Sequence, residues 1–186
     1  MPSRNRLPRA AAYHRAGFSI VEVMIVLTLL TVGIGMFAGT LGSIMGLGPS
    51  LRESARAVEA ARSVIEGMRA ENFNELWALY NADPADDPGG AGTAPGAGFA
   101  MQGLSPVAGD ADGLVGIVIF PEIGGELRED SADADLGMPR DLNLDLVQDA
   151  ADHAADYQVL PVLVRVEWQG KGPARRIDMY TTLTAP

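Results

Sequence analysis

A run of 29 residues without a charged side chain, residues 23–51, is the feature that most constrains how this 186-residue chain can fold. The first two-thirds of the run is densely apolar, and about 20 such residues are enough to cross a bilayer as a helix. A secretory signal peptide has a shorter apolar region, about 7–15 residues, followed by a small-residue cleavage site. The run therefore predicts a membrane-spanning helix. The alternatives are a signal peptide, a plain single-pass anchor and a buried helix of a soluble protein.

Charge is distributed unevenly along the chain. Residues 1–17 hold four of the 14 basic residues and no acidic one, so residues 18–186 carry ten basic residues against all 24 acidic ones. An arginine-rich flank before an apolar helix predicts that this end stays in the cytoplasm and that the rest is exported. The acidic body argues against nucleic acid as the main partner, because phosphate binding needs clustered Lys and Arg. The four basic residues are Arg4, Arg6, Arg9 and Arg15.

One carboxylate, Glu22, stands at the start of the apolar run. An ionisable side chain inside a membrane span costs about 2.5–3.5 kcal/mol on insertion scales, and less near the edge, so it usually marks a function or a partner. The surrounding sequence, RAGFSIVEVMIVL at residues 15–27, closely resembles the leader junction and N-terminal helix of type IV prepilins and pseudopilins. In that family a glycine ends a short basic leader, a phenylalanine usually begins the mature chain, and a glutamate follows four residues later.

The resemblance implies cleavage between Gly17 and Phe18 by a prepilin peptidase on the cytoplasmic side, followed by N-methylation of the new Phe18 amine. It also implies that Glu22 of one subunit neutralises the N-terminal amine of its neighbour as the helices stack. Such a pair offsets its desolvation only where the partners meet well. Glu22 is therefore expected to set the register of assembly, and a glutamate tolerated near the lipid headgroups is the alternative.

The glycine pattern departs from that of major pilins, which often carry a proline within this helix. Here no proline occurs between the leader and Pro49, and glycines recur instead. Glycine allows close helix packing in a membrane and also weakens a helix locally, so it suits a helix that packs in a filament and bends or melts partway. Ordinary helix packing is the alternative. The glycines are Gly33, Gly35, Gly39, Gly42, Gly46 and Gly48.

After the GLGPS sequence at 46–50, helical spacing of apolar residues predicts a new, amphipathic helix over residues 50–80, with Trp77 and Tyr80 in the core. Gly, Ala, Pro and Asp then dominate residues 81–113, which we expect to form a loop without regular structure. Residues 144–155 are the one place in the following acidic stretch where a short helix is expected.

Three segments have strand patterns. Residues 113–120 form a short apolar run rich in β-branched side chains, and residues 157–168 and 175–183 alternate around a QGKGP turn, which predicts a hairpin. Pro161 limits its strand to an edge position or a late start of pairing. The ending also resembles the C-terminal hairpin of minor pilins and pseudopilins, with its V-x-V-x-W, Gly and Thr-Thr-Leu elements.

The acidic stretch holds the candidates for metal binding. Asp141, Asn143 and Asp145 have the alternate spacing that opens a calcium loop, but Leu146 stands where such a loop needs glycine. A solvated acidic surface is therefore favoured over calcium, and no cofactor is expected.

Enzymatic function is not expected. The only histidine after the leader, His153, lies among acidic residues and is interpreted as solvated. The sequence has no nucleophile elbow, HExxH pair or phosphate-binding glycine loop, and no cysteine for a disulfide, a thiolate nucleophile or a metal site.

These patterns together predict an α+β protein in which a long N-terminal helix, transmembrane and then amphipathic, packs on a small antiparallel sheet that ends in a C-terminal hairpin. The expected parts are a basic leader (1–17), a transmembrane and filament-core helix (18–48), an amphipathic helix (50–80) and an extracytoplasmic domain (81–186). The resemblance implies a minor pilin or pseudopilin of a type IV pilus or type II secretion filament. It places the chain in the inner membrane and then in the filament, with lipid, peptidase and other subunits as partners. An unprocessed, membrane-anchored binding module is the alternative.

Overall fold

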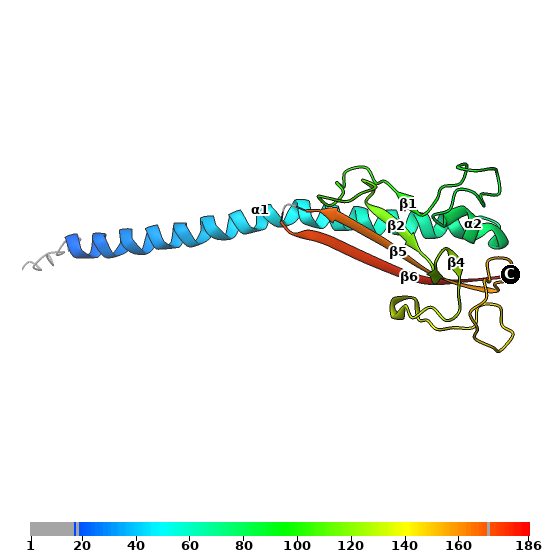
Figure 1. Cartoon of the computed structure of the whole chain (residues 1–186). Helices are drawn as coiled ribbons and strands as arrows, with labels where there is room; N and C mark the ends of the chain where they lie inside the picture. Colours follow the sequence, from blue (N-terminus) through cyan, green and yellow to red (C-terminus); the bar gives the residue numbers. More distant parts are fainter. Residues whose placement is uncertain (1–16, 18, 171) are drawn as a thin grey trace, which may run out of the picture. The chain divides into compact units, whose positions relative to one another are not determined.

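The structure is a computed structural model that describes residue 17, residues 19–170 and residues 172–186, with the side chains of 42–47 excepted. Residues 1–16 of the expected leader and Phe18 lie outside the described residues. The chain divides into two compact units, Met1–Gly46 and Leu47–Pro186, which are considered separately below (Figure 1).

Helix α1 (Ile20–Ala70) begins with the apolar run and includes Pro49. A second helix starting at the GLGPS sequence is therefore not observed. Proline removes one backbone hydrogen bond and crowds the carbonyl four residues earlier, yet helices can accommodate it with a local adjustment. The division between the two units, after Gly46, falls in this same stretch of glycine and proline.

Helix α1 ends at Ala70, ten residues before the expected end of the amphipathic helix. Asn72 is extended (φ −68°, ψ 121°), and its side chain accepts a hydrogen bond from the backbone N–H of Asn74. Asparagine bonded to the backbone in this way favours the start of a new turn over the continuation of a helix. The chain accordingly continues as the 3₁₀ turn η1 (Phe73–Glu75) and the short helix α2 (Leu76–Tyr80).

The main sheet has four antiparallel strands in the order β1-β2-β5-β6. The expected C-terminal hairpin is confirmed: β5 and β6 pair along their whole length, from Val159 opposite Thr184 to Gln169 opposite Ala174 (Figure 1). The expected strand within residues 113–120 is also present, as β2. The strands are β1 (Gly98–Phe99), β2 (Gly116–Ile119), β5 (Val159–Gln169) and β6 (Ala174–Thr184).

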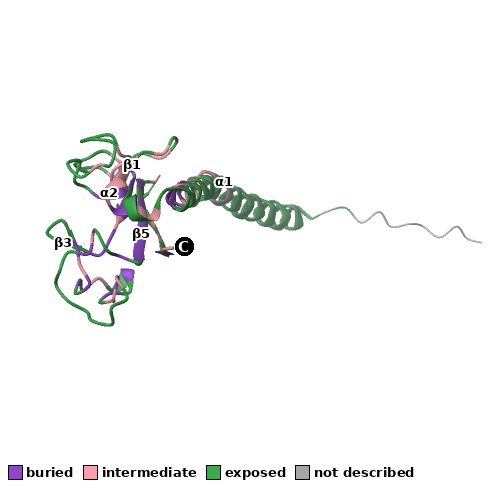
Figure 2. Cartoon of the chain, turned by 90° about the vertical axis from the view of Figure 1, so that its right-hand side faces the viewer, coloured by how far each residue is buried: buried purple, intermediate pink, exposed green. Residues whose placement is uncertain are grey.

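One face of β5 forms the centre of the core. Its alternate side chains are buried together with the inner face of the second half of α1 and with Trp77 and Tyr80, as expected for those two aromatic residues (Figure 2). The edges of this contact are polar, because Trp168 Nε1 donates to Glu53 Oε2 at 3.4 Å and Arg69 Nη2 donates to Thr181 Oγ1 at 3.4 Å. The buried side chains are Leu160, Val162, Val164, Val166 and Trp168 on β5, and Ala57, Ala61, Ile65 and Met68 on α1.

Pro161 lies where β5 is paired with β6 but not yet with β2. It lies opposite Thr182 of β6, whereas pairing with β2 begins only at Leu163, opposite Ile119. Proline has no N–H for a second ladder, so it fits where the strand has a partner on one side only. The late start of pairing that the sequence predicts is thus observed with β2.

Residues 121–157 cover the other face of β5 near its beginning. Their only regular elements are the two-stranded ribbon of β3 (Glu122–Ile123) and β4 (Glu126–Leu127) and the 3₁₀ turn η2 (Ala134–Leu136). Tyr157 then ties this segment to the helices, because its hydroxyl donates to Phe73 O at 2.6 Å and accepts from Trp77 N at 3.3 Å.

The helix expected at 144–155 is wrong. Leu144 and Leu146 have φ values of 64° and 73°, in the left-handed region that ends a right-handed helix. The carboxylate of Asp141 accepts hydrogen bonds from the N–H groups of both leucines, at 2.6 and 2.8 Å. Aspartate side chains here take the place of helical carbonyls as acceptors, which is how aspartate competes with helix formation.

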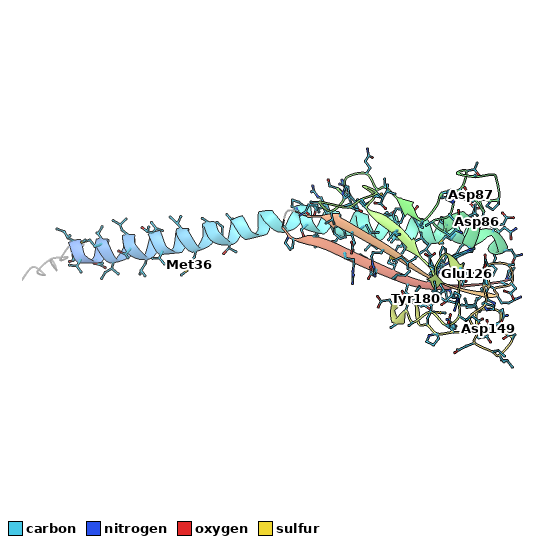
Figure 3. The ribbon with its side chains drawn as sticks, viewed as in Figure 1. Met36, Asp86, Asp87, Glu126, Asp149 and Tyr180 are labelled. Carbon is cyan, nitrogen blue, oxygen red and sulfur yellow. The ribbon has the colours of Figure 1, made fainter. Side chains whose placement is uncertain are left out.

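The expected loop at 81–113 contains β1 as its one regular element, and turns occupy the rest. Asp86 and Asp87, labelled in Figure 3, stabilise its first half. Asp86 accepts from Asn81 Nδ2 at 2.7 Å, and Asp87 accepts from the N–H groups of Thr93 and Ala94 at 2.8 and 3.2 Å.

Truncation of a core side chain tests this packing. Leu160→Ala should destabilise the domain by about 2–5 kcal/mol, because Leu160 is completely buried and the substitution leaves a cavity. The matched control is Leu146→Ala, at a leucine that is 93% exposed, and should cost less than about 0.5 kcal/mol. Unfolding of the full chain in detergent is followed by the fluorescence of Trp77 and Trp168, both of which are buried. Equal costs for the two variants would contradict the packing described.

Candidate functional site

Gly17, the residue before the expected cleavage point, is exposed and outside any helix or strand. Among the described residues, a side chain added at this glycine would meet no atom within 4 Å. Phe18, expected to be the new N-terminus and the methylated residue, lies outside the described residues. Gly17 is therefore open to an approaching enzyme, whereas the bond that it shares with Phe18 has no described geometry.

Ser19 begins helix α1, a role that the sequence reading missed. Its Oγ accepts a hydrogen bond from Val21 N at 3.3 Å, and its carbonyl accepts one from Val23 N at 3.1 Å. A serine in this position with a glutamate three residues later is the capping-box pattern. The signal was present in the sequence as Ser-Ile-Val-Glu at 19–22.

Glu22, the expected assembly residue, is exposed in the first turn of α1. A negative charge at a helix N-terminus is stabilised by the backbone N–H groups of the first turn. This position therefore gives Glu22 a local reason to be an acid, in addition to any role between subunits. Glutamine can fill the same capping-box position without a charge, which makes the two roles separable.

The segment Ile20–Leu41 is the helix, among the described residues, that is long and apolar enough to cross a membrane. The signal sequences and buried helices of other proteins pass the same test of length and composition, but every residue of this segment is exposed (Figure 2). Side chains project on all sides of the helix, Met36 among them (Figure 3). The hydroxyls of Thr28, Thr31 and Thr40 donate to the carbonyls four residues earlier, so the helix itself satisfies its polar side chains.

The three candidate calcium ligands are engaged in the turns of their own loop. Both oxygens of Asp141 accept backbone N–H groups, as described above. Asn143 Oδ1 accepts from Asp145 N at 3.1 Å, and Asp145 Oδ1 accepts from Val147 N at 2.8 Å. Calcium binding there stays a prediction, and every ligand oxygen named here already has a hydrogen-bond donor.

His153 is buried, and the interpretation as a solvated histidine is wrong: its side chain is 4% exposed. Nδ1 lies 3.1 Å from Asp156 Oδ1, and Nε2 lies 3.3 Å from Asp149 Oδ1 and 3.8 Å from Glu129 Oε1. The spacing of Asp149, His153 and Asp156 was visible in the sequence, but Glu129 lies more than twenty residues away, and only the fold brings it to the imidazole.

Glu129 is a completely buried carboxylate that organises the backbone around it. Oε1 accepts from Leu142 N at 2.6 Å and from Asn143 N at 3.3 Å, and Oε2 accepts from Asp149 N at 3.2 Å. Backbone N–H groups in a segment without regular structure need such acceptors when they are buried. We name Glu129, Asp149, His153 and Asp156 together the histidine cluster.

Charge in the histidine cluster changes the titration of its members. Burial lowers the pKa of His153, but the hydrogen bonds and charges of Asp156, Glu129 and Asp149 outweigh it, so the pKa lies above the ordinary value of 6.5. The pKa of Asp149 is lowered, first by the hydrogen bond from Ala151 N and also by His153. Opposite charges at this distance each favour the ionised form of the other.

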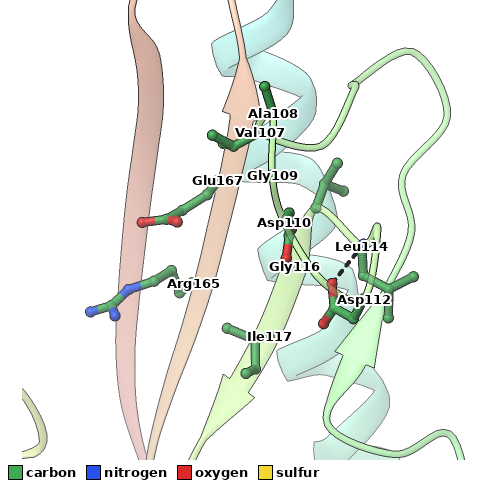
Figure 4. A pocket seen from close by; sticks show the side chains of 11 residues that line it. Val107, Ala108, Gly109, Asp110, Asp112, Leu114, Gly116, Ile117, Arg165 and Glu167 are labelled. Carbon is green, nitrogen blue, oxygen red and sulfur yellow. Dashed lines mark hydrogen bonds between the residues drawn. The ribbon is translucent and has the colours of Figure 1, made fainter.

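A pocket of about 360 Å³ lies beside β2 and β5 (Figure 4). Arg165 and Glu167 border it, and Arg165 forms an ion pair with Asp178 at 2.9 Å. On its other side Asp112 accepts from Leu114 N at 2.8 Å. Arg165 and Asp112 thus hold the sheet and the loop, and the described residues that line the pocket include no serine, threonine, cysteine, lysine or histidine.

Comparison with known families gives one result. The family model for the prokaryotic N-terminal methylation motif matches residues 13–38, so the chain carries the type IV prepilin-like signature that its sequence predicts. No curated protein and no solved structure matches the chain. The motif supports a prepilin-processed, type IV pilin-like protein, a class that is structural. Together with the apolar helix it fits a membrane-anchored pilin.

The carboxylate of Glu129 gives a test of the acidic segment. Glu129→Gln should lower the free energy of unfolding by about 1–3 kcal/mol, because an amide NH₂ cannot accept the N–H groups that the lost oxygen accepted. The control is Glu126→Gln, at an exposed carboxylate 3.6 Å from Arg128, which should cost less than about 1 kcal/mol. Denaturant unfolding of the full chain is measured with a metal chelator present. A cost at Glu129 no larger than at Glu126 would contradict this role.

Proposed function

We propose that this chain is a minor pilin or pseudopilin. In this proposal it is a structural subunit that a prepilin peptidase cleaves between Gly17 and Phe18, and it joins a type IV pilus or type II secretion-type filament through its N-terminal helix. The observation that carries the proposal is the methylation motif at residues 13–38 together with an apolar helix exposed on all sides.

The exposed apolar surface of the N-terminal helix is compatible with two successive environments, first lipid and then other helices. A helix that is apolar all round is stable in lipid or among other helices. Before assembly the segment Ile20–Leu41 would cross the inner membrane, with the arginine-rich end in the cytoplasm and the sheet domain in the periplasm. In the filament, the same surface would pack against the helices of other subunits, and small residues such as Gly33 and Gly35 would let those helices approach closely.

Glu22 would fix the register of that packing. Cleavage after Gly17 creates a new amine, four residues before Glu22 in the chain. A carboxylate and an ammonium both lose hydration among apolar helices, and each is stabilised there only by an opposite charge nearby. Pairing between neighbouring subunits would therefore favour one axial position over those in which both charges stay unpaired.

Processing at Gly17 is tested first. Co-expression with a prepilin peptidase should yield a mature chain that starts at Phe18 and carries one added methyl group, as measured by intact mass and N-terminal sequencing. Gly17→Val should block cleavage, because its side chain meets no atom of the described residues within 4 Å but would obstruct the protease at the backbone. Ala11→Val adds similar bulk within the leader and should be cleaved normally. A wild-type chain that remains uncut while it spans the membrane would leave the anchored binding module as the function.

The charge of Glu22 is tested with two substitutions. Glu22→Gln keeps the capping-box geometry and removes the charge, whereas Glu22→Ala removes both. If the charge sets the register, both variants should still be inserted and cleaved. The efficiency of assembly should fall at least about tenfold for both, because the neighbour's amine stays unpaired. Assembly is measured as the share of subunit in isolated filaments. The control, Glu59→Gln, changes an exposed carboxylate in the second half of α1.

The two variants also separate the two roles of this residue. Normal assembly of Glu22→Gln with poor assembly of Glu22→Ala would assign Glu22 to the start of the helix alone. Normal assembly of both would show that Glu22 has no part in register.

A further inference from the structure

The histidine cluster has the arrangement of a metal site. One ligand atom from each of Glu129, Asp149 and His153 lies within 4.8 Å of the other two. His153 Nε2 is 3.3 Å from Asp149 Oδ1 and 3.8 Å from Glu129 Oε1. Zinc binds nitrogen and carboxylate oxygen at about 2.0–2.2 Å in a tetrahedron, which places neighbouring ligand atoms about 3.3–3.6 Å apart. The two separations from His153 Nε2 are close to this spacing, and the two oxygens lie within 4.8 Å of each other. Glu129 Oε1 and Asp149 Oδ1 would bind the cation in addition to, or in exchange for, the backbone N–H groups that they accept.

Asp156 supplies an independent feature of such a site. Its Oδ1 lies 3.1 Å from His153 Nδ1, on the side of the ring that faces away from Glu129 and Asp149. A metal-bound histidine almost always donates its second ring N–H to a carboxylate or carbonyl, which fixes the ring orientation and the tautomer. Held in this way, the imidazole directs the lone pair of Nε2 at the two carboxylates.

The charge balance around His153 also favours a cation. Three carboxylates surround one imidazole, and one of them, Glu129, is completely buried. In the part of the chain that the structure describes, no arginine or lysine nitrogen lies within 4.0 Å of a carboxylate oxygen of Glu129, Asp149 or Asp156. Three backbone N–H groups stabilise the Glu129 carboxylate, but even a protonated His153 leaves the three carboxylates with an excess of negative charge, which a cation would reduce.

We propose that Glu129, Asp149 and His153 bind a divalent transition-metal cation of the zinc type, with Asp156 as the positioning residue. Imidazole is a preferred ligand of zinc, whereas calcium and magnesium take oxygen ligands almost alone. Asp149, whose side chain is 47% exposed, gives the cation a route from solvent, while the other two ligands are buried. The fourth position of the tetrahedron is open to water.

The proposed site would join the two ends of the acidic segment. Glu129 follows β4, and Asp149 and His153 come twenty and more residues later, so one cation would close the intervening chain into a loop. Just before Asp149 that loop exposes Leu144, Leu146 and Val147. The cation would therefore fix the end of the loop that carries these exposed apolar side chains.

The test is titration of the full chain in detergent with Zn²⁺ alone, at neutral pH and without a histidine tag. Calorimetry should show one saturable site, and saturating Zn²⁺ should raise the midpoint of thermal unfolding by about 5 °C or more. His153→Gln should abolish this site. Asp156→Asn should weaken binding about 10–100-fold, as expected for a residue that orients a ligand.

Two matched controls are available in the chain. His14→Gln removes the other histidine, which lies in the leader, and Glu126→Gln removes an exposed carboxylate near the cluster. Both should bind Zn²⁺ as the wild type does. If His153→Gln fails to fold, the imidazole NMR signals of the wild-type chain are measured instead. The signals of His153 should shift on addition of Zn²⁺, whereas those of His14 should not.

Three results would overturn the proposal. The first is the absence of saturable Zn²⁺ binding, and the second is undiminished binding by folded His153→Gln. The third is tighter binding of Ca²⁺ than of Zn²⁺.

In a metal-free cluster, a protonated His153 would stabilise the fold at low pH, and that stability would be lost as pH rises through its raised pKa. This pH dependence without any response to Zn²⁺ would assign the cluster to an ion pair. Binding is measured on the isolated chain, so the result does not depend on the filament role.

Discussion

Helix α1 exposes its apolar side chains over residues 20–41, and this constraint governs where the described part of the chain can be stable. Water cannot solvate such a surface favourably, so the segment requires lipid or other helices. Its backbone groups are satisfied within the helix, and its threonine hydroxyls are bonded to carbonyls of the same helix. The groups that still need a partner from outside the helix are its apolar side chains and the charged carboxylate of Glu22 at its start.

The second half of α1 satisfies the same requirement within the chain. There the apolar residues occupy one face, and the strand β5 covers it with an equally apolar face. Ala57 and Ala61 are completely buried in this contact, so a larger side chain at either position would have to displace its neighbours. One helix thus carries two kinds of surface, and the change occurs in the stretch of glycine and proline at 46–49, where the two compact units also divide.

The sequence predicted the structure correctly where the apolar residues follow a single regular spacing. The long apolar helix, the buried face with Trp77 and Tyr80, and the β5–β6 hairpin follow from an apolar run, helical spacing and alternation. Pro161 could even be assigned a pairing constraint. The helix expected at 144–155 failed because aspartate side chains bond to nearby N–H groups and hold Leu144 and Leu146 in the left-handed region. Composition alone does not distinguish such bonds from a helix with an acidic surface.

His153 failed for a different reason. Its neighbours in the sequence are acidic and small, which describes a solvated position, but the fold adds Glu129 from a distant part of the chain. Only the three-dimensional path of the loop brings the buried carboxylate of Glu129 to within 3.8 Å of this histidine. Ser19 was the opposite case, since its capping pattern stood in the sequence beside Glu22 and was overlooked in favour of the assembly role.

The domain therefore has two parts that are stabilised in different ways. The helix and sheet are held by apolar burial, which depends little on pH or on ions. The segment 121–157 has few regular hydrogen bonds. Its carboxylates accept backbone N–H groups that strands would otherwise pair, and one imidazole bonds to two of the carboxylates. Electrostatic interactions of this kind respond to protons and cations, because both change the charge that each group carries. The stability of the helix and sheet is therefore expected to vary little with pH and ions, whereas that of segment 121–157 is expected to depend on both.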